Sequence, residues 1–196
     1  MVRLAVTGGI ACGKSTVASV LAARGIPVCE ADALAHDLMR PGQPVYDRVV
    51  EAFGRGILDG KGEIDRDRLG ARVFSDEEER ARLNERVHPG VVAAWTAWLD
   101  GLDRAEPVAA VVVPLLHEVG AHGGWDAVIC VAAREETQLR RLQERGLSRE
   151  QAVARVRAQW PVARKMVASD YVILNEGSLM MLEEQTMRII RRVLEN

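Results

Sequence analysis

The residues with the clearest chemical pattern lie near the N-terminus, where 8–15 read Gly-Gly-Ile-Ala-Cys-Gly-Lys-Ser. This segment matches the G-x-x-x-x-G-K-[ST] pattern of a phosphate-binding loop. Glycines let the backbone curl so that successive N–H groups point at phosphate oxygens, and the following helix adds the positive end of its dipole. In this pattern Lys14 reaches the β- and γ-phosphates and the Ser15 hydroxyl binds Mg²⁺. The sequence therefore predicts a nucleoside triphosphate site formed by Gly8, Gly9, Ile10, Ala11, Cys12, Gly13, Lys14, Ser15 and Thr16.

Cys12 is the least expected residue of this loop. A thiol beside a helix N-terminus and near Lys14 should have a lowered pKa, because both favour the thiolate. This predicts that Cys12 is more reactive than Cys29 and Cys130, which fall in predicted buried strands, and that MgATP protects it. The alternative is a side chain that points away from the phosphates and packs inertly beside the helix.

Short apolar runs predict five β-strands, separated by segments with helical patterns. The first leads into the phosphate loop, and a helix over 14–24 follows and ends at Gly25. The run at 108–113 does not alternate, as expected of a strand buried on both faces of a parallel sheet. The fold class is therefore α/β, a doubly wound parallel sheet. Its predicted strands are 2–6, 26–29, 108–113, 128–132 and 171–174.

Two further segments show how the chain is organised. Ser75-x-x-Glu78 is a capping box for a helix predicted to stop near His88-Pro89, and Ser148-x-x-Gln151 is one for a helix running to about Trp160.

The chain between the second and third strands is too long for one crossover, which predicts a ligand-handling helical insertion. Basic charge gathers in 134–165, with nine basic and four acidic residues. An Arg-rich mobile lid would exclude water from phosphoryl transfer and neutralise charge.

Composition narrows the function classes further. The 196 residues are 48% hydrophobic and 28% charged, values typical of a globular chain with one core. A formal charge of −2 gives no general surface for nucleic acid. The longest apolar run, 107–116, is interrupted by Pro114 and is about half of the ~20 residues that a bilayer requires. With no apolar leader and no C-x-x-C pair, we expect a cytoplasmic protein without a membrane or nucleic-acid partner.

The phosphate loop alone does not identify the reaction. A GTPase would need a guanine-reading N-K-x-D motif, and the sequence has none. The D-x-x-G match at 59–62 follows no apolar strand, so we interpret it as a hairpin or loop. A transport ATPase or helicase would be larger. The short chain, the long insertion and the Arg-rich segment favour a small-molecule kinase. The alternative from another function class is a nucleotide-binding switch that has no acceptor substrate.

Further motifs follow the phosphate loop in a consistent order. They are Glu30-Ala-Asp32, Pro41-Gly42, Phe53-Gly54, Ile57-Leu58, Ile64-Asp65-Arg66, Val73-Phe74, Leu83-Asn84, His88-Pro89, Pro114-Leu115-Leu116-x-Glu118, Gln138-x-x-Arg141-Leu142, Arg155-x-x-x-Gln159, Lys165 and Asp170 to Asn175-x-Gly177. Together with Thr7 to Thr16, they make nearly the whole chain resemble the dephospho-CoA kinase family. The resemblance implies phosphorylation of the ribose 3′-hydroxyl of dephospho-CoA by MgATP, the final step of coenzyme A synthesis.

The resemblance also implies the architecture. The expected fold is a P-loop, nucleoside-monophosphate-kinase-like three-layer fold with a five-stranded parallel sheet. A nucleotide-binding core would comprise 1–32, 107–133 and 166–196, a helical acceptor-binding insertion 33–106, and a lid 134–165.

Individual roles follow from the same resemblance. Asp32 would face the acceptor hydroxyl as general base or orienting group, and a plain helix cap is the alternative. Arg141 would contact phosphate from the lid, so the expected catalytic residues are Lys14, Asp32 and Arg141. Asn175 and Gly177 would approach the adenine of ATP, unless they form only a turn. The expected acceptor-binding residues are Thr7, Asp32, His88, Pro114, Leu115 and Glu118.

Three further basic side chains can each be interpreted in more than one way. His88 could instead satisfy a backbone carbonyl at a helix end. Lys165 could reach phosphate from the far end of the lid. Arg140, beside Arg141, points elsewhere on a helix and is expected to be solvated or ion-paired.

Overall fold

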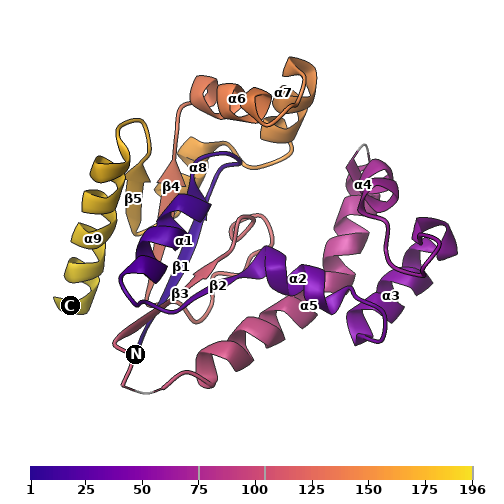
Figure 1. Ribbon diagram of the computed structural model, residues 1–196, viewed down its shortest axis with the longest axis horizontal. Helices are drawn as coiled ribbons and strands as arrows, with labels where there is room; N and C mark the ends of the chain where they lie inside the picture. Colours follow the sequence, from indigo (N-terminus) through magenta and orange to yellow (C-terminus); the bar gives the residue numbers. More distant parts are fainter. Residues whose placement is uncertain (75, 104, 196) are drawn as a thin grey trace. The chain divides into compact units, whose positions relative to one another are not determined.

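The computed structural model describes residues 1–74, 76–103 and 105–195, which fold as two compact units. An α/β unit combines Met1–Glu30 with Leu102–Asn196, and a helical unit comprises Ala31–Gly101 (Figure 1). Within the described ranges, no helix has the length and apolar composition needed to cross a membrane.

The α/β unit is built on a five-stranded parallel sheet with the order β2-β3-β1-β4-β5. The predicted number, direction and approximate positions of the strands are confirmed. Because β1 is central, the phosphate loop emerges in the middle of the carboxyl edge, the edge where such sheets bind ligands. The strands are β1 (Val2–Gly8), β2 (Val28–Glu30), β3 (Val108–Val112), β4 (Ala127–Ala132) and β5 (Tyr171–Leu174).

Helices cover both faces of this sheet. On one face, α1 (Lys14–Ala23) and α9 (Leu179–Glu195) lie together and share an apolar cluster with the strands, which includes Leu4, Val6, Val17, Leu21, Ile189 and Ile190. On the other, α8 (Val162–Val167) packs against β1 and β4. Helices α6 (Glu135–Glu144) and α7 (Arg149–Arg157) pack on each other between β4 and α8 in sequence (Figure 1).

Glycines and one capping box mark helix ends in this unit, and the sequence predicted Gly25 and the capping box among them. Gly25 has φ +75° and, with Ile26, closes α1 through hydrogen bonds to the carbonyls of the last turn. Gly146, with φ +90°, closes α6 in the same way. The capping box of Ser148 and Gln151 at the start of α7 is confirmed, although α7 ends at Arg157 rather than near Trp160.

The helical unit contains one long helix against which three others pack. Its elements are α2 (Ala31–Leu38), α3 (Pro44–Phe53), a 3₁₀ turn η1 (Arg55–Ile57), α4 (Arg66–Phe74) and α5 (Glu77–Asp100). Leu58 and Ile64 form an antiparallel bridge, so of the two forms predicted for 59–62, a hairpin or a loop, the structure has the hairpin. Ser75 lies outside the described residues, and Asp76 caps α5 by accepting hydrogen bonds from two backbone N–H groups.

The predicted helix end at His88-Pro89 is wrong, because α5 continues through Pro89 to Asp100. Proline removes one helical hydrogen bond, a cost of about 3 kcal/mol. Beyond it, Val91, Trp95 and Leu99 recur at four-residue spacing and are all buried. Their burial contributes more than the proline costs, at roughly 1.5–3 kcal/mol for each large side chain.

Candidate active site

The phosphate loop joins β1 to α1 with backbone angles that few residues adopt. Gly13, the N-cap of α1, has φ +98°, and Ala11 has φ +57°, the only non-glycine with positive φ among the described residues. A Cβ on Gly13 would lie 2.1 Å from Asn175 Nδ2, so a side chain does not fit there. This curled backbone turns successive N–H groups to one side, the arrangement that binds anions.

Lys14 folds back over its own loop. Its Nζ donates hydrogen bonds to the carbonyl oxygens of Gly9 at 2.8 Å and Gly8 at 3.1 Å. Ser15 follows in the first turn of α1 and is exposed. Both residues therefore lie at the N-terminus of α1, where the helix dipole adds positive potential.

Side chains from two distant segments bind this loop. Arg141 donates to the carbonyls of Ala11 at 3.1 Å and Asn175 at 3.0 Å, and Asn175 Nδ2 donates to Cys12 O at 2.9 Å. Gln159 Oε1 accepts a hydrogen bond from Ile10 N at 2.9 Å. The structure thus brings Arg141 and Asn175 to the phosphate loop. The sequence analysis did not predict that Gln159 binds the phosphate loop. The available signal was its place in the Arg155-x-x-x-Gln159 motif.

Glu176 connects the loop after β5 to the start of α6. Its carboxylate accepts from Arg134 N at 2.6 Å and from Thr137 Oγ1 at 3.0 Å. The bond from the Arg134 backbone N–H is the largest of the effects that hold the pKa of Glu176 below its ordinary value. A carboxylate at this end of a helix also interacts favourably with the dipole. Asn175 and Gly177 are thereby held next to α6.

Cys12 does not have the environment predicted for a reactive thiol. Its side chain is fully buried and accepts a hydrogen bond from Gln138 Nε2 at 3.1 Å. Burial raises the pKa of the Cys12 thiol above its ordinary value, and this effect outweighs the lowering by Lys14. The expected lowered pKa is therefore wrong, because the side chain turns from the phosphate face into the core.

This burial predicts that Cys12 is inert toward a maleimide. We expect Cys12 to be labelled no faster than Cys29 and Cys130, whose burial raises their pKa values to about 11. MgATP should not change the labelling of Cys12, because the thiol is inaccessible before any phosphate arrives. Mass-spectrometric mapping with and without MgATP measures this. Selective labelling of Cys12 that MgATP suppresses would contradict the buried position.

Lys165 is a buried lysine that pairs with a carboxylate. Its side chain is fully buried, and its Nζ lies 2.7 Å from Glu118 Oε1 and 2.9 Å from Pro114 O. Pro114 O also accepts from the Thr7 hydroxyl at 3.3 Å, and Glu118 Oε1 accepts from Trp160 N at 3.0 Å. Acceptor binding by Thr7, Pro114, Leu115 and Glu118 stays a prediction.

The helical unit contains the two remaining predicted site residues. Asp32 is exposed in the first turn of α2, two residues after the end of β2. His88 lies within α5 with its ring edge-on to Trp95, and burial lowers its pKa. Their roles toward an acceptor stay predictions.

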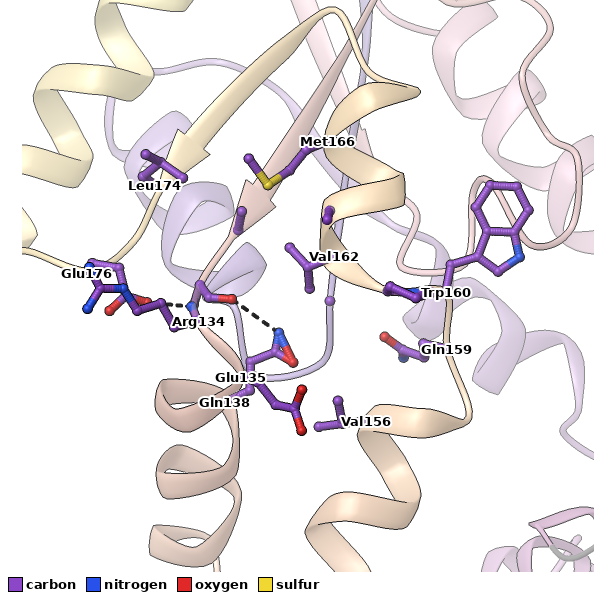
Figure 2. Close-up of a pocket in the computed structure, with 15 residues that line it drawn as sticks. Arg134, Glu135, Gln138, Val156, Gln159, Trp160, Val162, Met166, Leu174 and Glu176 are labelled. Atoms are coloured by element: carbon purple, nitrogen blue, oxygen red, sulfur yellow. Dashed lines mark hydrogen bonds between the residues drawn. The ribbon is translucent and has the colours of Figure 1, made fainter.

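Two cavities adjoin the phosphate loop. The larger, about 540 Å³, lies between α6 and the 156–166 segment and has mostly apolar walls, including Val156, Trp160, Val162 and Met166 (Figure 2). It reaches the phosphate loop only at Gly9. The smaller, about 260 Å³, is lined by Ala11, Gly13, Ser15, Thr16, Arg141, Arg145, Asn175, Leu179 and Leu182. Because its walls join the phosphate loop to Asn175, which is predicted to approach the adenine, the smaller cavity is the candidate for the nucleotide base.

Comparisons with known proteins decide between the kinase and switch interpretations. Residues 2–181 match the family model of dephospho-CoA kinase. The chain belongs to the dephospho-CoA kinase family. A dephospho-CoA kinase of Geobacillus kaustophilus is 44% identical over 191 residues, which cover 96% of this chain and 95% of that protein.

Solved structures similar to this chain support the family assignment. One from Thermus thermophilus is 34% identical, has a TM-score of 0.84, and covers 97% of this chain and 96% of its own. The dephospho-CoA kinase of Campylobacter jejuni is 26% identical with a TM-score of 0.62, covering 99% and 98%. The predicted family, kinase class and fold are thus confirmed, and a kinase of this family takes ATP as its phosphate donor.

Proposed function

We propose that this chain transfers the γ-phosphoryl group of ATP to the ribose 3′-hydroxyl of dephospho-CoA, giving coenzyme A and ADP. The family match over residues 2–181 carries this proposal. The curled loop before α1 supports it, because its N–H groups and Lys14 form an anion site. We place the reaction in the cytoplasm, where free thiols such as those of this chain stay reduced.

The nucleotide would bind along the phosphate loop with its adenine in the cavity between α1, Arg141 and Asn175. From its place over the carbonyls of Gly8 and Gly9, the Lys14 ammonium would bind the β- and γ-phosphates. Arg141, already fixed at the loop, would add a second positive charge near the phosphates. Its planar fork of N–H donors suits phosphoryl oxygens.

Mg²⁺ would be held by the Ser15 hydroxyl, in the first turn of α1 next to Lys14. An exposed hydroxyl at a phosphate site fits this ion, which prefers oxygen ligands and keeps several waters. When bound, the ion would supply positive charge that stabilises the phosphates during transfer.

The acceptor would bind to residues of the lid and of the loop after β3. Asp32 would orient the 3′-hydroxyl or accept its proton as the hydroxyl oxygen bonds to the γ-phosphorus. The bond from that phosphorus to the β–γ bridging oxygen breaks, and ADP carries away the electron pair. Because such transition states are loose, orientation by Asp32 contributes more than proton removal.

A coupled ADP-release assay tests the acceptor. Release should require dephospho-CoA, and adenosine, AMP, shikimate and gluconate should give rates near the ATP-only background. Equal turnover with AMP, or none with dephospho-CoA, would assign the chain to another small-molecule reaction. Tight ATP binding without turnover on any acceptor would favour the switch interpretation.

Substitution of Arg141 tests the nucleotide site, and substitution of its neighbour Arg140 is the matched control. We expect Arg141→Ala to lower kcat/KM for ATP at least ~30-fold, since it removes about 2 kcal/mol of charge-assisted hydrogen bonds. Arg140→Ala should change it less than about twofold, because Arg140 is exposed and pairs only loosely with Glu144 at 3.9 Å. Steady-state kinetics of the two variants compares them, and similar losses would refute a specific role for Arg141.

A further inference from the structure

The peptide group that joins Gly9 to Ile10 in the phosphate loop is held from both sides. Its N–H, on Ile10, donates a hydrogen bond to Gln159 Oε1 at 2.9 Å. Its carbonyl oxygen, on Gly9, accepts from Lys14 Nζ at 2.8 Å and from Cys12 N at 3.2 Å. In a trans peptide the N–H and the C=O lie in one rigid plane and point in opposite directions. A side chain that fixes the N–H therefore also fixes the carbonyl oxygen that Lys14 binds.

This peptide group can rotate, because the residue on one side of it is a glycine. Gly9 has no Cβ to restrict its backbone angles. A larger residue does not fit, since a Cβ there would lie 2.6 Å from Val162 Cγ2 and 2.9 Å from Gln138 Nε2. The close packing of α6 and α8 against the loop thus requires a glycine, and the orientation of the peptide depends on its hydrogen bonds.

Gln159 is suited to hold the peptide because its own backbone is anchored. It lies two residues after the end of α7, and its N–H donates to Val156 O at 3.3 Å. The next residue, Trp160, donates its N–H to Glu118 Oε1 at 3.0 Å, and Glu118 is paired with the buried Lys165 at 2.7 Å. Gln159 thus reaches the phosphate loop from a fixed place in the wall of the larger cavity (Figure 2).

We propose that Gln159 is a positioning residue, which orients the Gly9–Ile10 peptide so that its carbonyl oxygen holds the Lys14 ammonium beside the phosphates of ATP. The inference rests on the proposed function, in which Lys14 binds those phosphates. An ammonium has three donors, so Lys14 can hold loop carbonyls and a phosphate oxygen at the same time. Without Gln159 the peptide turns more freely, and the Lys14 side chain loses more conformational entropy when ATP fixes it.

A double-mutant cycle separates this role from general support of the fold and from direct contact with ATP. If Gln159 acts through Lys14, its contribution to kcat/KM for ATP disappears when Lys14 is absent. If Gln159 supports the fold or contacts the nucleotide independently, its removal lowers kcat/KM by the same factor in both backgrounds, because independent effects add.

The cycle uses four proteins: the unchanged chain, Lys14→Ala, Gln159→Met and the variant with both substitutions. Methionine keeps the length of the side chain and removes the acceptor oxygen. The ADP-release assay at saturating dephospho-CoA gives kcat/KM for ATP. We expect Gln159→Met to lower this constant about 10-fold when Lys14 is present and less than twofold when alanine replaces Lys14, the scale of one hydrogen bond near a charged group.

Equal factors in the two backgrounds, or no loss in either, would overturn the inference and leave the proposed function standing. No turnover of dephospho-CoA by the unchanged chain would overturn the proposed function, and the inference with it.

Gln159→Ala runs in the same cycle, and it also serves if the methionine variant does not fold. Alanine removes the same acceptor oxygen but leaves a different volume. Its total loss can be larger, but the ratio of its factors with and without Lys14 should match that of Gln159→Met. Ratios that differ several-fold between the two variants would assign the effect to packing and would overturn the inference.

Gln143→Met is the matched control, because Gln143 is an exposed glutamine on α6. This substitution should change kcat/KM for ATP less than twofold with and without Lys14. A loss that depends on Lys14 as strongly as that of Gln159→Met would overturn the inference.

Discussion

Replacing Lys14 with alanine is expected to lower kcat/KM for ATP at least ~100-fold, equivalent to about 3 kcal/mol of transition-state stabilisation. This loss is expected because of where the Lys14 ammonium lies. The Lys14 ammonium starts from the carbonyls of Gly8 and Gly9, directly over the curled backbone, and can reach phosphate oxygens by rotating its own side chain. Removing it deletes a charge that the transition state needs more than the bound substrate does.

Steady-state kinetics with ATP as the varied substrate measures this effect. Arg188→Ala serves as the control, because Arg188 is exposed on α9 and forms an exposed ion pair with Glu184. It should retain full activity. The circular dichroism spectrum and melting temperature should be unchanged in both variants. A Lys14→Ala protein that is fully folded and loses less than about fivefold would contradict the assignment.

Asp32→Asn is expected to separate chemistry from nucleotide binding. The amide keeps the shape of the side chain but loses the charge that orients or deprotonates the acceptor hydroxyl. We therefore expect kcat to fall at least ~100-fold while the dissociation constant of ATP stays within a few-fold. Calorimetry of ATP binding and single-turnover rates give the two quantities separately.

Asp37→Asn is the matched control for Asp32, because Asp37 lies on the same helix and forms an exposed ion pair with Arg40 at 3.1 Å. It should change kcat less than twofold. If Asp32→Asn instead weakened nucleotide binding strongly and left kcat at saturating ATP unchanged, Asp32 would belong to the Mg²⁺ site. If both aspartates behaved alike, Asp32 would be only a residue of the first helical turn.

The parts of the fold that depend on local pattern could be predicted from the sequence. The phosphate loop and α1 follow from a contiguous motif, and the strands follow from short apolar runs. Gly25 and the Ser148–Gln151 capping box marked helix ends because their hydrogen bonds connect residues a few positions apart. Helix α5 was predicted too short, because a local signal at Pro89 is overridden by packing that Val91, Trp95 and Leu99 make along the rest of the helix.

The orientation of individual site residues depends on partners far away in the chain. Cys12 turns inward to Gln138, which lies 126 residues later. Lys165 meets Glu118 and Pro114 rather than solvent. Neither pairing leaves a periodic or spaced pattern, so the sequence indicated the residue types without the direction of their side chains. The glutamine that binds Ile10 N was likewise visible only as part of a motif.

The position of the new phosphate on the product is the most direct test of phosphoryl transfer to the ribose 3′-hydroxyl of dephospho-CoA. The purified chain is incubated with MgATP and dephospho-CoA, and the product is compared with authentic coenzyme A by chromatography and ³¹P NMR. A parallel reaction uses the 3′-deoxy analogue of dephospho-CoA. We expect one product, phosphorylated at the ribose 3′-oxygen, with stoichiometric ADP, and no transfer to the 3′-deoxy analogue. Phosphate at another oxygen, or turnover of the 3′-deoxy analogue at the rate of dephospho-CoA, would contradict it.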